Sequence, residues 1–209
     1  MLHQTTETAS NSAQDNREAR RASTASCAKF DDLTLSPKPP TILRQPRLSE
    51  IEALRQAGSK AMGVPVAPSD VVEHMLARDP ETVWVFETEG RITGGAAFLF
   101  LSEFGVERLL AGELDPHAPA EECLVRAGEP PTGVYFWGIY RDDPASGGIK
   151  DILKMLETER FKNADLWTFP TGDIGRAFFE RIGLRPVEAG PPNLYRRVRR
   201  TSDSSNPEG

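Results

Sequence analysis

The sequence predicts an α/β domain in which a mixed β-sheet of about six to seven strands is flanked by about four helices. Short apolar runs alternate with segments of helical periodicity from residue 41 to residue 199. A helical segment separates the apolar runs VYFWGIY and ADLWTF, which is typical of adjacent parallel strands joined by a crossover. The pair Glu89-Gly90 indicates a hairpin between two further runs. The predicted order is β-α-α-β-β-β-α-β-α-β-β.

The first half of the domain is predicted as a strand, two helices and the hairpin. TILRQPR is a short strand, and LSEIEALRQAGSKAMG is a helix that Ser49 can cap. APSDVVEHMLARDP is a second helix, with Ser69 or Asp70 as its cap and Pro80 at its end. The second strand of the hairpin has apolar residues on both faces, so we expect it to be central and covered on both sides. The inward-facing helix residues are Leu48, Ile51, Leu54, Met62, Val71, Val72, Met75 and Leu76.

The second half begins with the least regular part of the domain, residues 103–132, in which one helical turn is expected after Phe104. An insertion of this length is more often functional or mobile than inert. Helix 146–161 then follows VYFWGIY, and TGDIGRAFFERIG is a helix with Thr171 as its cap and Gly183 at its end. RPVE and NLYRRVRR are terminal strands. The inward-facing helix residues are Ile149, Ile152, Leu153, Leu156, Ile174, Phe178 and Ile182.

Length and charge restrict the class of protein. The chain has 209 residues, with 31 acidic and 25 basic side chains and a net charge of -6. Residues 1–38 and 201–209 have few large apolar side chains, so they are predicted to be disordered tails around one domain at 39–200. The acidic balance makes nucleic acid an unfavourable partner, although YRRVRR is a local exception.

The sequence contains no clear targeting or metal signal. No apolar run approaches the roughly 20 residues of a membrane helix, and the N-terminal stretch lacks the apolar core of a secretory signal. Cys27 and Cys123 have no metal or redox spacing, so no metal site is predicted. We therefore expect a cytoplasmic protein with reduced thiols and no membrane partner. The oligomeric state is left open, a homodimer included.

Two stretches resemble the GNAT superfamily, the acyl-CoA-dependent N-acyltransferases. VYFWGIYRDDPASGGIKDILKML is similar to the family's central strand, pyrophosphate loop and following helix. ADLWTFPTGDIGRAFFERIGLRPV is similar to the next strand and to the helix that ends in the family's F-Y-x-x-x-G-F signature, here FFERIGL. The resemblance extends from about Thr41 to Arg199. It implies a GNAT-like mixed sheet, acetyl-CoA or another acyl-CoA as cofactor, and a small-molecule or peptide amine as acceptor.

The resemblance also implies where the cofactor would bind. The pantetheine arm would pair with the backbone of the central strand like an added strand, and the pyrophosphate would lie on N–H groups at the start of the next helix. Gly138 either removes a side chain where the cofactor approaches or only relieves crowding in a packed strand. The implied contact residues are Trp137, Gly138, Ile139, Tyr140, Gly147, Gly148, Ile149 and Lys150.

The pyrophosphate loop departs from the family pattern R/Q-x-x-G-x-G/A. Gly148 matches the first glycine, but Lys150 stands at the second small position. Lys150 either supplies charge to a phosphate or is a solvated lysine of the first turn. Gly147-Gly148 is then either a weakened phosphate cradle or part of a plain turn, in which Asp143 caps the helix and Pro144 takes its first position.

Catalytic groups are harder to identify. The family often uses a Tyr of the helix-end signature as the acid, and this position is Phe179, which has no proton to donate. Tyr140 is the alternative donor, and Glu103 is the carboxylate best placed to act as a base, directly or through water. A packed tyrosine and a solvated loop acid are the alternative interpretations of these two residues.

Two functions from different classes remain. One is a GNAT-type N-acyltransferase, favoured by the strand-glycine-helix layout and by Gly138. The other is a GNAT-like binding or regulatory module without catalysis, favoured by the degenerate loop and by Phe179. A third interpretation, nucleic-acid contact, rests on a basic cluster that a solvated edge strand guarded by charge also explains. Its members are Arg196, Arg197, Arg199 and Arg200.

Overall fold

The computed structural model describes residues 39–142 and 147–199, all of which belong to the compact unit that begins at Pro39. The predicted tails at 1–38 and 201–209 lie outside the described residues. The same holds for Asp143 and Pro144, which were predicted to start the helix after VYFWGIY, and for Arg200.

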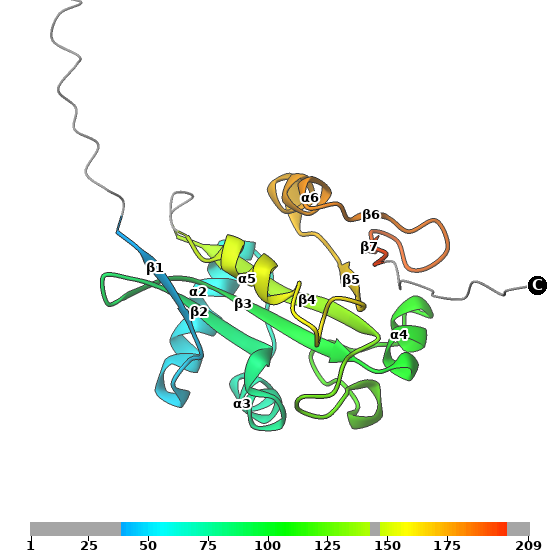
Figure 1. Cartoon of the computed structure of the whole chain (residues 1–209), viewed down its shortest axis with the longest axis horizontal. Coiled ribbons are helices and arrows are strands. Elements are labelled where there is room, and N and C mark those ends of the chain that lie inside the picture. The colour runs from blue at the N-terminus through cyan, green and yellow to red at the C-terminus, as the bar shows by residue number, and fades with distance from the viewer. Residues whose placement is uncertain (1–38, 143–146, 200–209) are drawn as a thin grey trace, which may run out of the picture. The chain divides into compact units, whose positions relative to one another are not determined.

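The described residues form a seven-stranded sheet with the order β1-β2-β3-β4-β5-β7-β6 (Figure 1). Within it β4 and β5 are parallel and the other neighbours are antiparallel, which confirms the predicted mixed sheet and crossover. The strands are β1 (Thr41–Arg44), β2 (Val83–Thr88), β3 (Arg91–Leu101), β4 (Gly133–Arg141), β5 (Asp165–Thr168), β6 (Arg185–Pro186) and β7 (Tyr195–Arg197).

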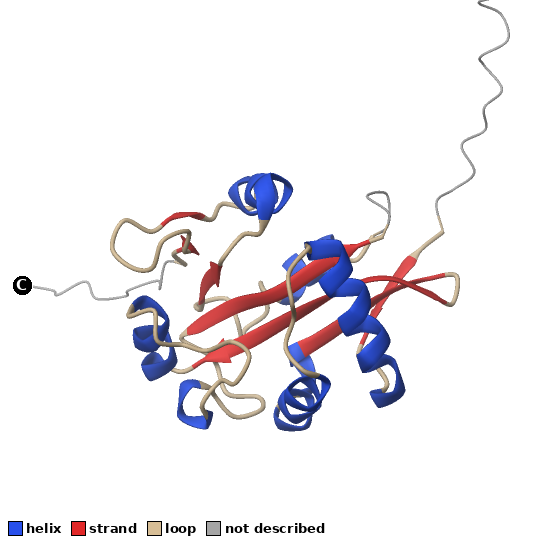
Figure 2. Cartoon of the chain, turned by 180° about the vertical axis from the view of Figure 1, so that it is seen from behind, coloured by secondary structure: helices blue, strands red, loops and turns tan. Residues whose placement is uncertain are grey.

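Helices cover both faces of this sheet (Figures 1 and 2). Two separate apolar clusters result, one beneath α5 and α6 and the other beneath α3 and α4. Strand β3 contributes Phe98 and Phe100 to the first cluster and Leu99 and Leu101 to the second, so the prediction of a central strand covered on both sides is confirmed. The helices are α2 (Ile51–Met62), α3 (Ser69–Arg78), α4 (Glu103–Leu110), α5 (Ile149–Met155) and α6 (Gly172–Arg181).

Helix α5 is shorter than the helix predicted at 146–161. It ends at Met155, and turns replace the helix from there to β5. The hydroxyl of Thr158 donates a hydrogen bond to the Met155 carbonyl at 2.8 Å, and the Arg199 guanidinium donates to the carbonyls of Leu156 and Phe161. These side-chain donors satisfy carbonyl groups that a longer helix would have paired with backbone N–H groups.

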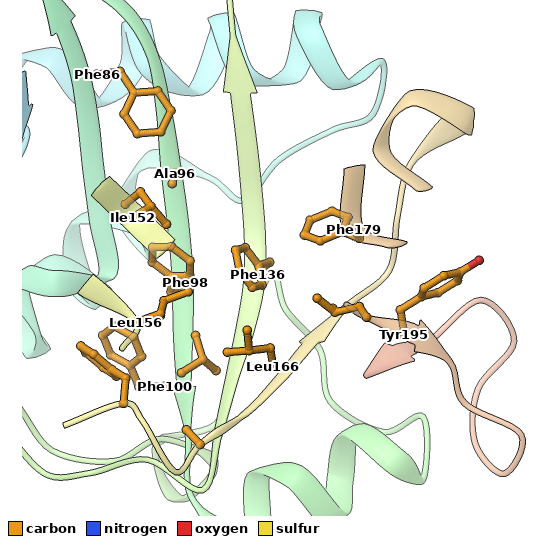
Figure 3. Close-up of a cluster of buried hydrophobic side chains, with 14 residues drawn as sticks. Phe86, Ala96, Phe98, Phe100, Phe136, Ile152, Leu156, Leu166, Phe179 and Tyr195 are labelled. Atoms are coloured by element: carbon orange, nitrogen blue, oxygen red, sulfur yellow. The ribbon is translucent and has the colours of Figure 1, made fainter. Parts of the chain in front are cut away.

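The inward face of α6 also differs from the prediction. Ile174 is 90% exposed, whereas Phe179 is 5% exposed. The C-terminal part of α6 packs against the sheet, where the Phe179 ring lies edge-on to Phe136 of β4 (Figure 3). The helical period of the apolar residues therefore predicted the existence of α6 but not which of its turns reaches the core.

The predicted helix caps are not used. Neither Ser49 nor Thr171 makes a side-chain capping bond at the start of α2 or α6. The start of α2 is held instead by the Glu50 carboxylate, which accepts hydrogen bonds from both terminal nitrogens of Arg44 and from the Arg47 backbone N–H. A non-local ion pair has replaced the local cap.

Candidate functional site

Strand β4 has a long edge without a neighbouring strand. It pairs with β3 over its whole length, from Gly133 to Arg141, but it pairs with β5 only at Gly133, Val134 and Tyr135. Beyond Tyr135, the side of β4 that faces β5 has no strand partner within the described residues. Alternate residues of an extended strand direct their N–H and C=O groups to each side, so part of this backbone is free to bind a ligand. We call residues 136–141 the open edge of β4.

A β-bulge at Trp137 begins this divergence. On β3, Ala97 is the partner of Gly138 and Phe98 is the partner of Phe136, which leaves Trp137 as an extra residue of β4. Such a bulge bends its strand and increases the local twist. The bend lies just beyond Tyr135, where the pairing with β5 stops.

The Tyr140 side chain lies on the face of β4 that α2 covers, and a side chain at Gly138 would point to the same face. A Cβ atom on Gly138 would lie 3.3 Å from the terminal methyl of Met62, tighter than ordinary van der Waals contact. The Tyr140 ring lies against Gly58 of α2 and Gly95 of β3. The packing interpretation of Gly138 is therefore supported, because the space that its missing side chain leaves is filled by Met62.

Tyr140 is a titratable residue within the open edge itself. Burial raises the pKa of its phenol to about 12, and the negative charge of Asp142 acts in the same direction. The phenol is therefore protonated throughout the physiological range and is available there as a hydrogen-bond donor.

Phe179 lies on the opposite face of the sheet from Tyr140. Its ring centroid is 5.2 Å from that of Phe136 and 5.0 Å from that of Phe178, both in edge-on geometry. The signature position of α6 thus lies beside Phe136, the first residue of the open edge. It presents an apolar ring there and no proton donor.

Gly147 and Gly148 are required by packing. The Gly147 N–H donates a hydrogen bond to the Thr41 hydroxyl at 2.8 Å, so this N–H is not free for a phosphate. Gly148 has a φ of +96°, and a Cβ atom there would lie 2.5 Å from the Phe86 ring. The two glycines allow the turn before α5 to approach β1 and β2 closely, which no local sequence signal could reveal.

The backbone N–H groups of Gly148, Ile149 and Lys150 follow this turn. No described residue accepts a hydrogen bond from them, and α5 has no side-chain cap. Helix α5 has only seven residues, so its dipole is weaker than that of a long helix. What remains of the predicted cradle is this set of backbone donors, which lie next to the contacts of the turn with Thr41 of β1 and Phe86 of β2.

Glu103 does not join the other candidate residues. It is the first residue of α4, directly after β3, at the end of the sheet where Leu101 pairs with Gly133. Tyr140 pairs with Gly95 at the opposite end, seven residues along β4, which corresponds to roughly 20 Å. The exposed Glu103 carboxylate and the Tyr140 phenol therefore cannot act on one substrate atom in this arrangement.

The basic cluster near the C-terminus is engaged within the fold. Arg196 forms an ion pair with Asp165 and lies 4.7 Å from the centre of the Trp167 ring. Arg199 is 8% exposed and donates to the carbonyls of Leu156 and Phe161. Strand β7 lies between β5 and β6, so the interpretation of this segment as a solvated edge strand is wrong.

Among residues 39–142 and 147–199, no group of three or more His, Cys, Asp or Glu side chains is arranged to hold a metal ion. Within the same ranges, none of the helices has the length and apolar character needed to cross a bilayer.

Sequence comparisons identify no relative: no protein-family model matches the chain, and no curated protein matches it significantly. Comparison of structures is informative about the fold. The loading GNATL domain of CurA from Lyngbya majuscula is similar with a TM-score of 0.50 and 11% identity, over 76% of this chain and 97% of that domain. The chain has a GNAT-like fold. The fold predicted from the resemblance is thereby confirmed.

Two further structures are similar to the chain with lower TM-scores. A predicted acetyltransferase with acetyl-CoA from Clostridium acetobutylicum has a TM-score of 0.46 and 16% identity, over 71% of this chain and 92% of that one. The GphF GNAT-like decarboxylase in complex with isobutyryl-CoA also has a TM-score of 0.46 and 16% identity, over 68% of this chain and 72% of that one.

Proposed function

We propose that this protein binds an acyl-CoA along the open edge of β4 and transfers the acyl group to an amine. The observation that carries the proposal is the pairing of β4, which is complete toward β3 and stops after Tyr135 toward β5. The pantetheine arm of coenzyme A is a narrow chain with amide groups. It can pair with the free backbone groups of residues 136–141 as an added strand would.

The start of α5 supports the next part of the ligand. In this proposal the pantetheine arm leaves the open edge near Arg141, and the pyrophosphate lies on the backbone N–H groups of Gly148, Ile149 and Lys150, which follow Arg141 in the chain after a short segment. These donors have no described partner and suit the oxygens of a pyrophosphate. Lys150, which is exposed, adds a positive charge at the same point.

Acyl transfer requires little from the side chains. A neutral amine attacks the thioester carbonyl, a C–N bond forms, the C–S bond breaks, and the amine proton is released while the thiolate becomes a thiol. Backbone N–H groups of the open edge polarise the carbonyl oxygen. Tyr140, on the face of β4 toward α2, donates a hydrogen bond to the departing sulfur.

The raised pKa of Tyr140 limits its role. A phenol with a pKa of about 12 does not transfer its proton completely to a thiolate whose conjugate acid has a pKa near 8.5. Tyr140 therefore stabilises the leaving group as a hydrogen-bond donor, and the final proton comes from solvent. We therefore expect the turnover rate to depend only moderately on Tyr140, with a loss of about tenfold in Tyr140→Phe.

A second function, acyl-CoA binding without transfer, is favoured by one observation. Phe179 fills the signature position of α6 with a buried ring, and Glu103 lies at the far end of the sheet. Such a module would use the same open edge and the same backbone donors. It differs from the enzyme only in the absence of a reaction with amines.

The binding proposal is tested by calorimetric titration of acetyl-CoA together with amide hydrogen exchange. We expect micromolar binding and new protection of amides within residues 136–141, with the amides of α3 as an internal control. The absence of binding at millimolar acetyl-CoA, or protection confined to α3 or α4, would refute it. Release of free thiol with a panel of amines then separates the enzyme from the binding module.

A further inference from the structure

A surface groove of about 530 Å³ lies between α5 and the C-terminal end of α6, on the sheet face that both helices cover. One wall is α5, from its second residue to just beyond its end. The other wall is formed by the end of α6, the two residues that follow it, and β7. The lining residues are Lys150, Leu153, Lys154, Glu157, Arg181, Ile182, Gly183 and Arg197.

The charge of this groove is opposite to that of the whole chain. Four of its lining residues are cationic and one is acidic, whereas the protein has a net charge of -6. The acidic residue, Glu157, already accepts a hydrogen bond from the buried guanidinium of Arg199 at 3.2 Å. The local excess of positive charge therefore favours a partner with negative charge at this surface.

Cations on both walls are available to such a partner. Among residues 39–142 and 147–199, no carboxylate forms an ion pair with Arg181 or Arg197, and Arg197 donates a 3.4 Å hydrogen bond to the Ile182 carbonyl. Lys154 pairs with Asp151 at 3.0 Å, but these side chains are 67% and 42% exposed. An exposed pair contributes little to stability, so a carboxylate of the partner can replace Asp151 at little cost.

The groove also offers aliphatic contact surface. Leu153 and Ile182 lie on opposite walls and are both half-buried, and Ile182 packs against the core beneath the two helices. Aliphatic side chains of a partner can be removed from water between these two residues. The groove therefore suits a ligand that combines carboxylates with aliphatic groups.

The lining residues are spread along the groove. Lys150 and Glu157, at the two ends of the α5 wall, are seven residues apart, which corresponds to roughly 10 Å along a helix. An amphipathic helix presents an apolar stripe with charged residues on both of its flanks. A helix with acidic flanks therefore matches cations on two walls with aliphatic surface between them, in the way that helices bind to grooves.

A nucleic acid matches the groove less well. Single-stranded bases bind proteins largely by stacking on aromatic rings, and the eight lining residues include no aromatic side chain. A long polyanion is also repelled by the rest of a chain with a net charge of -6. An acidic helix places its charge at the groove alone.

We propose that this groove is a docking site for an acidic amphipathic helix of a partner protein. Aliphatic side chains of that helix contact Leu153 and Ile182, and its carboxylates contact Lys154, Arg181 and Arg197. The inference does not depend on the proposed function, because it requires neither the open edge of β4 nor an acyl-CoA.

Fluorescence anisotropy with a labelled synthetic peptide tests the inference. The probe is a helix of about four turns, with leucine on one face, glutamate on both flanks and a side-chain staple on the outer face. The comparison peptide has glutamine in place of every glutamate. We expect the full chain to bind the glutamate peptide about tenfold or more tightly, and this difference to decrease as salt is added. Equal binding of the two peptides would overturn the inference.

The double variant Lys154→Gln/Arg181→Gln removes one cation from each wall of the groove. Both side chains are exposed, so the fold should be unaffected. We expect the dissociation constant of the glutamate peptide to increase about tenfold or more, while that of the glutamine peptide is unchanged. An unchanged affinity for the glutamate peptide would contradict the assignment of these residues.

A matched control keeps the number of removed charges constant. Lys162 pairs with Glu159 at 2.6 Å in the same i,i+3 geometry as Lys154 and Asp151, and Arg176 is an exposed residue of α6 that does not line the groove. Lys162→Gln/Arg176→Gln should bind the glutamate peptide as the wild type does. An equal loss of affinity in this control would overturn the inference, since it would assign the effect to overall charge.

Two further measurements decide the place and the class of the partner. Amide hydrogen exchange with the glutamate peptide should show new protection in α5 and α6, and protection confined to other elements would refute the groove as the site. A labelled single-stranded oligothymidylate is the second probe, and we expect it to bind more weakly than the glutamate peptide. If it binds more tightly, and Lys154→Gln/Arg181→Gln loses it, the groove is a nucleic-acid surface and the inference is wrong.

Discussion

The backbone N–H of Gly147 donates a hydrogen bond to the side-chain oxygen of Thr41 at 2.8 Å, across 106 residues of sequence. This bond joins the turn before α5 to β1 at the edge of the sheet. It also removes one N–H from the set that a phosphate could use. The main role of Gly147 and Gly148 is thus to allow close packing. The backbone N–H donors that remain for a ligand begin at Gly148.

Thr41→Val tests this contact. The variant retains the shape of the side chain but leaves the Gly147 N–H without its acceptor and also breaks the 2.9 Å contact between the hydroxyls of Thr41 and Thr88. We expect a loss of about 1–2 kcal/mol in the free energy of unfolding, measured by chemical denaturation. Thr41→Ser, which keeps the hydroxyl, should lose clearly less. Equal losses in the two variants would argue against the hydrogen bond.

Gly148→Ala should destabilise the fold in two ways, by backbone strain and by a steric clash. Gly63→Ala should show the backbone strain alone. At Gly148 an added methyl meets both a φ of +96° and the Phe86 ring at 2.5 Å, whereas at Gly63 the φ is +69° with no atom within 4 Å. We expect Gly63→Ala to cost about 1 kcal/mol and Gly148→Ala about 2–4 kcal/mol. The midpoints of denaturant unfolding provide the comparison. Similar costs at both positions would show that the Phe86 contact relaxes without effect.

Phe179→Tyr restores the hydroxyl of the signature position. Because Phe179 packs against Phe136 in the core, we expect a loss of about 1–2 kcal/mol in stability from the buried hydroxyl. We also expect faster release of thiol from acetyl-CoA in the presence of an amine, since a donor now lies beside the open edge. Phe178→Tyr, at a half-buried position, is the control and should change neither quantity. If Phe179→Tyr leaves the turnover unchanged, the absence of a proton donor at this position does not limit the rate.

Glu50 makes stability depend on pH at the start of α2. Hydrogen bonds from Arg44 and from the Arg47 backbone lower the pKa of the Glu50 carboxyl from 4.5 to about 2. A depressed pKa in the folded state means that this stabilisation is complete above pH 4.5 and is lost as the pH falls toward 2. Glu50→Gln should therefore be less stable than wild type at pH 7 and approach it at pH 2.

Chemical denaturation at pH 7, 4 and 2 measures this difference. Glu107→Gln, an exposed position on α4, is the control and should show a small difference that does not vary with pH. A difference between Glu50→Gln and wild type that persists at pH 2 would contradict the ion-pair interpretation.

Local signals in the sequence were sufficient for the order and type of most elements. The hairpin turn has a positive φ at Gly90, and α2 ends with a left-handed Gly63, as the glycines at these positions indicate. The parallel pairing of β4 and β5 follows from the helical crossover between them, because a short turn cannot join parallel strands. Periodicity and turn chemistry act over a few residues, so one sequence is enough to read them.

Long-range contacts decided the features on which the candidate site depends. The bulge at Trp137 is defined only by the register of β4 against β3, and the open edge exists because β5 pairs with just three residues of β4. The length of α5 depends on Arg199, and the freedom of the Gly147 N–H depends on Thr41, both distant in sequence. Such contacts join residues whose own sequence neighbourhoods contain no signal of them, so only the packed chain could determine the site.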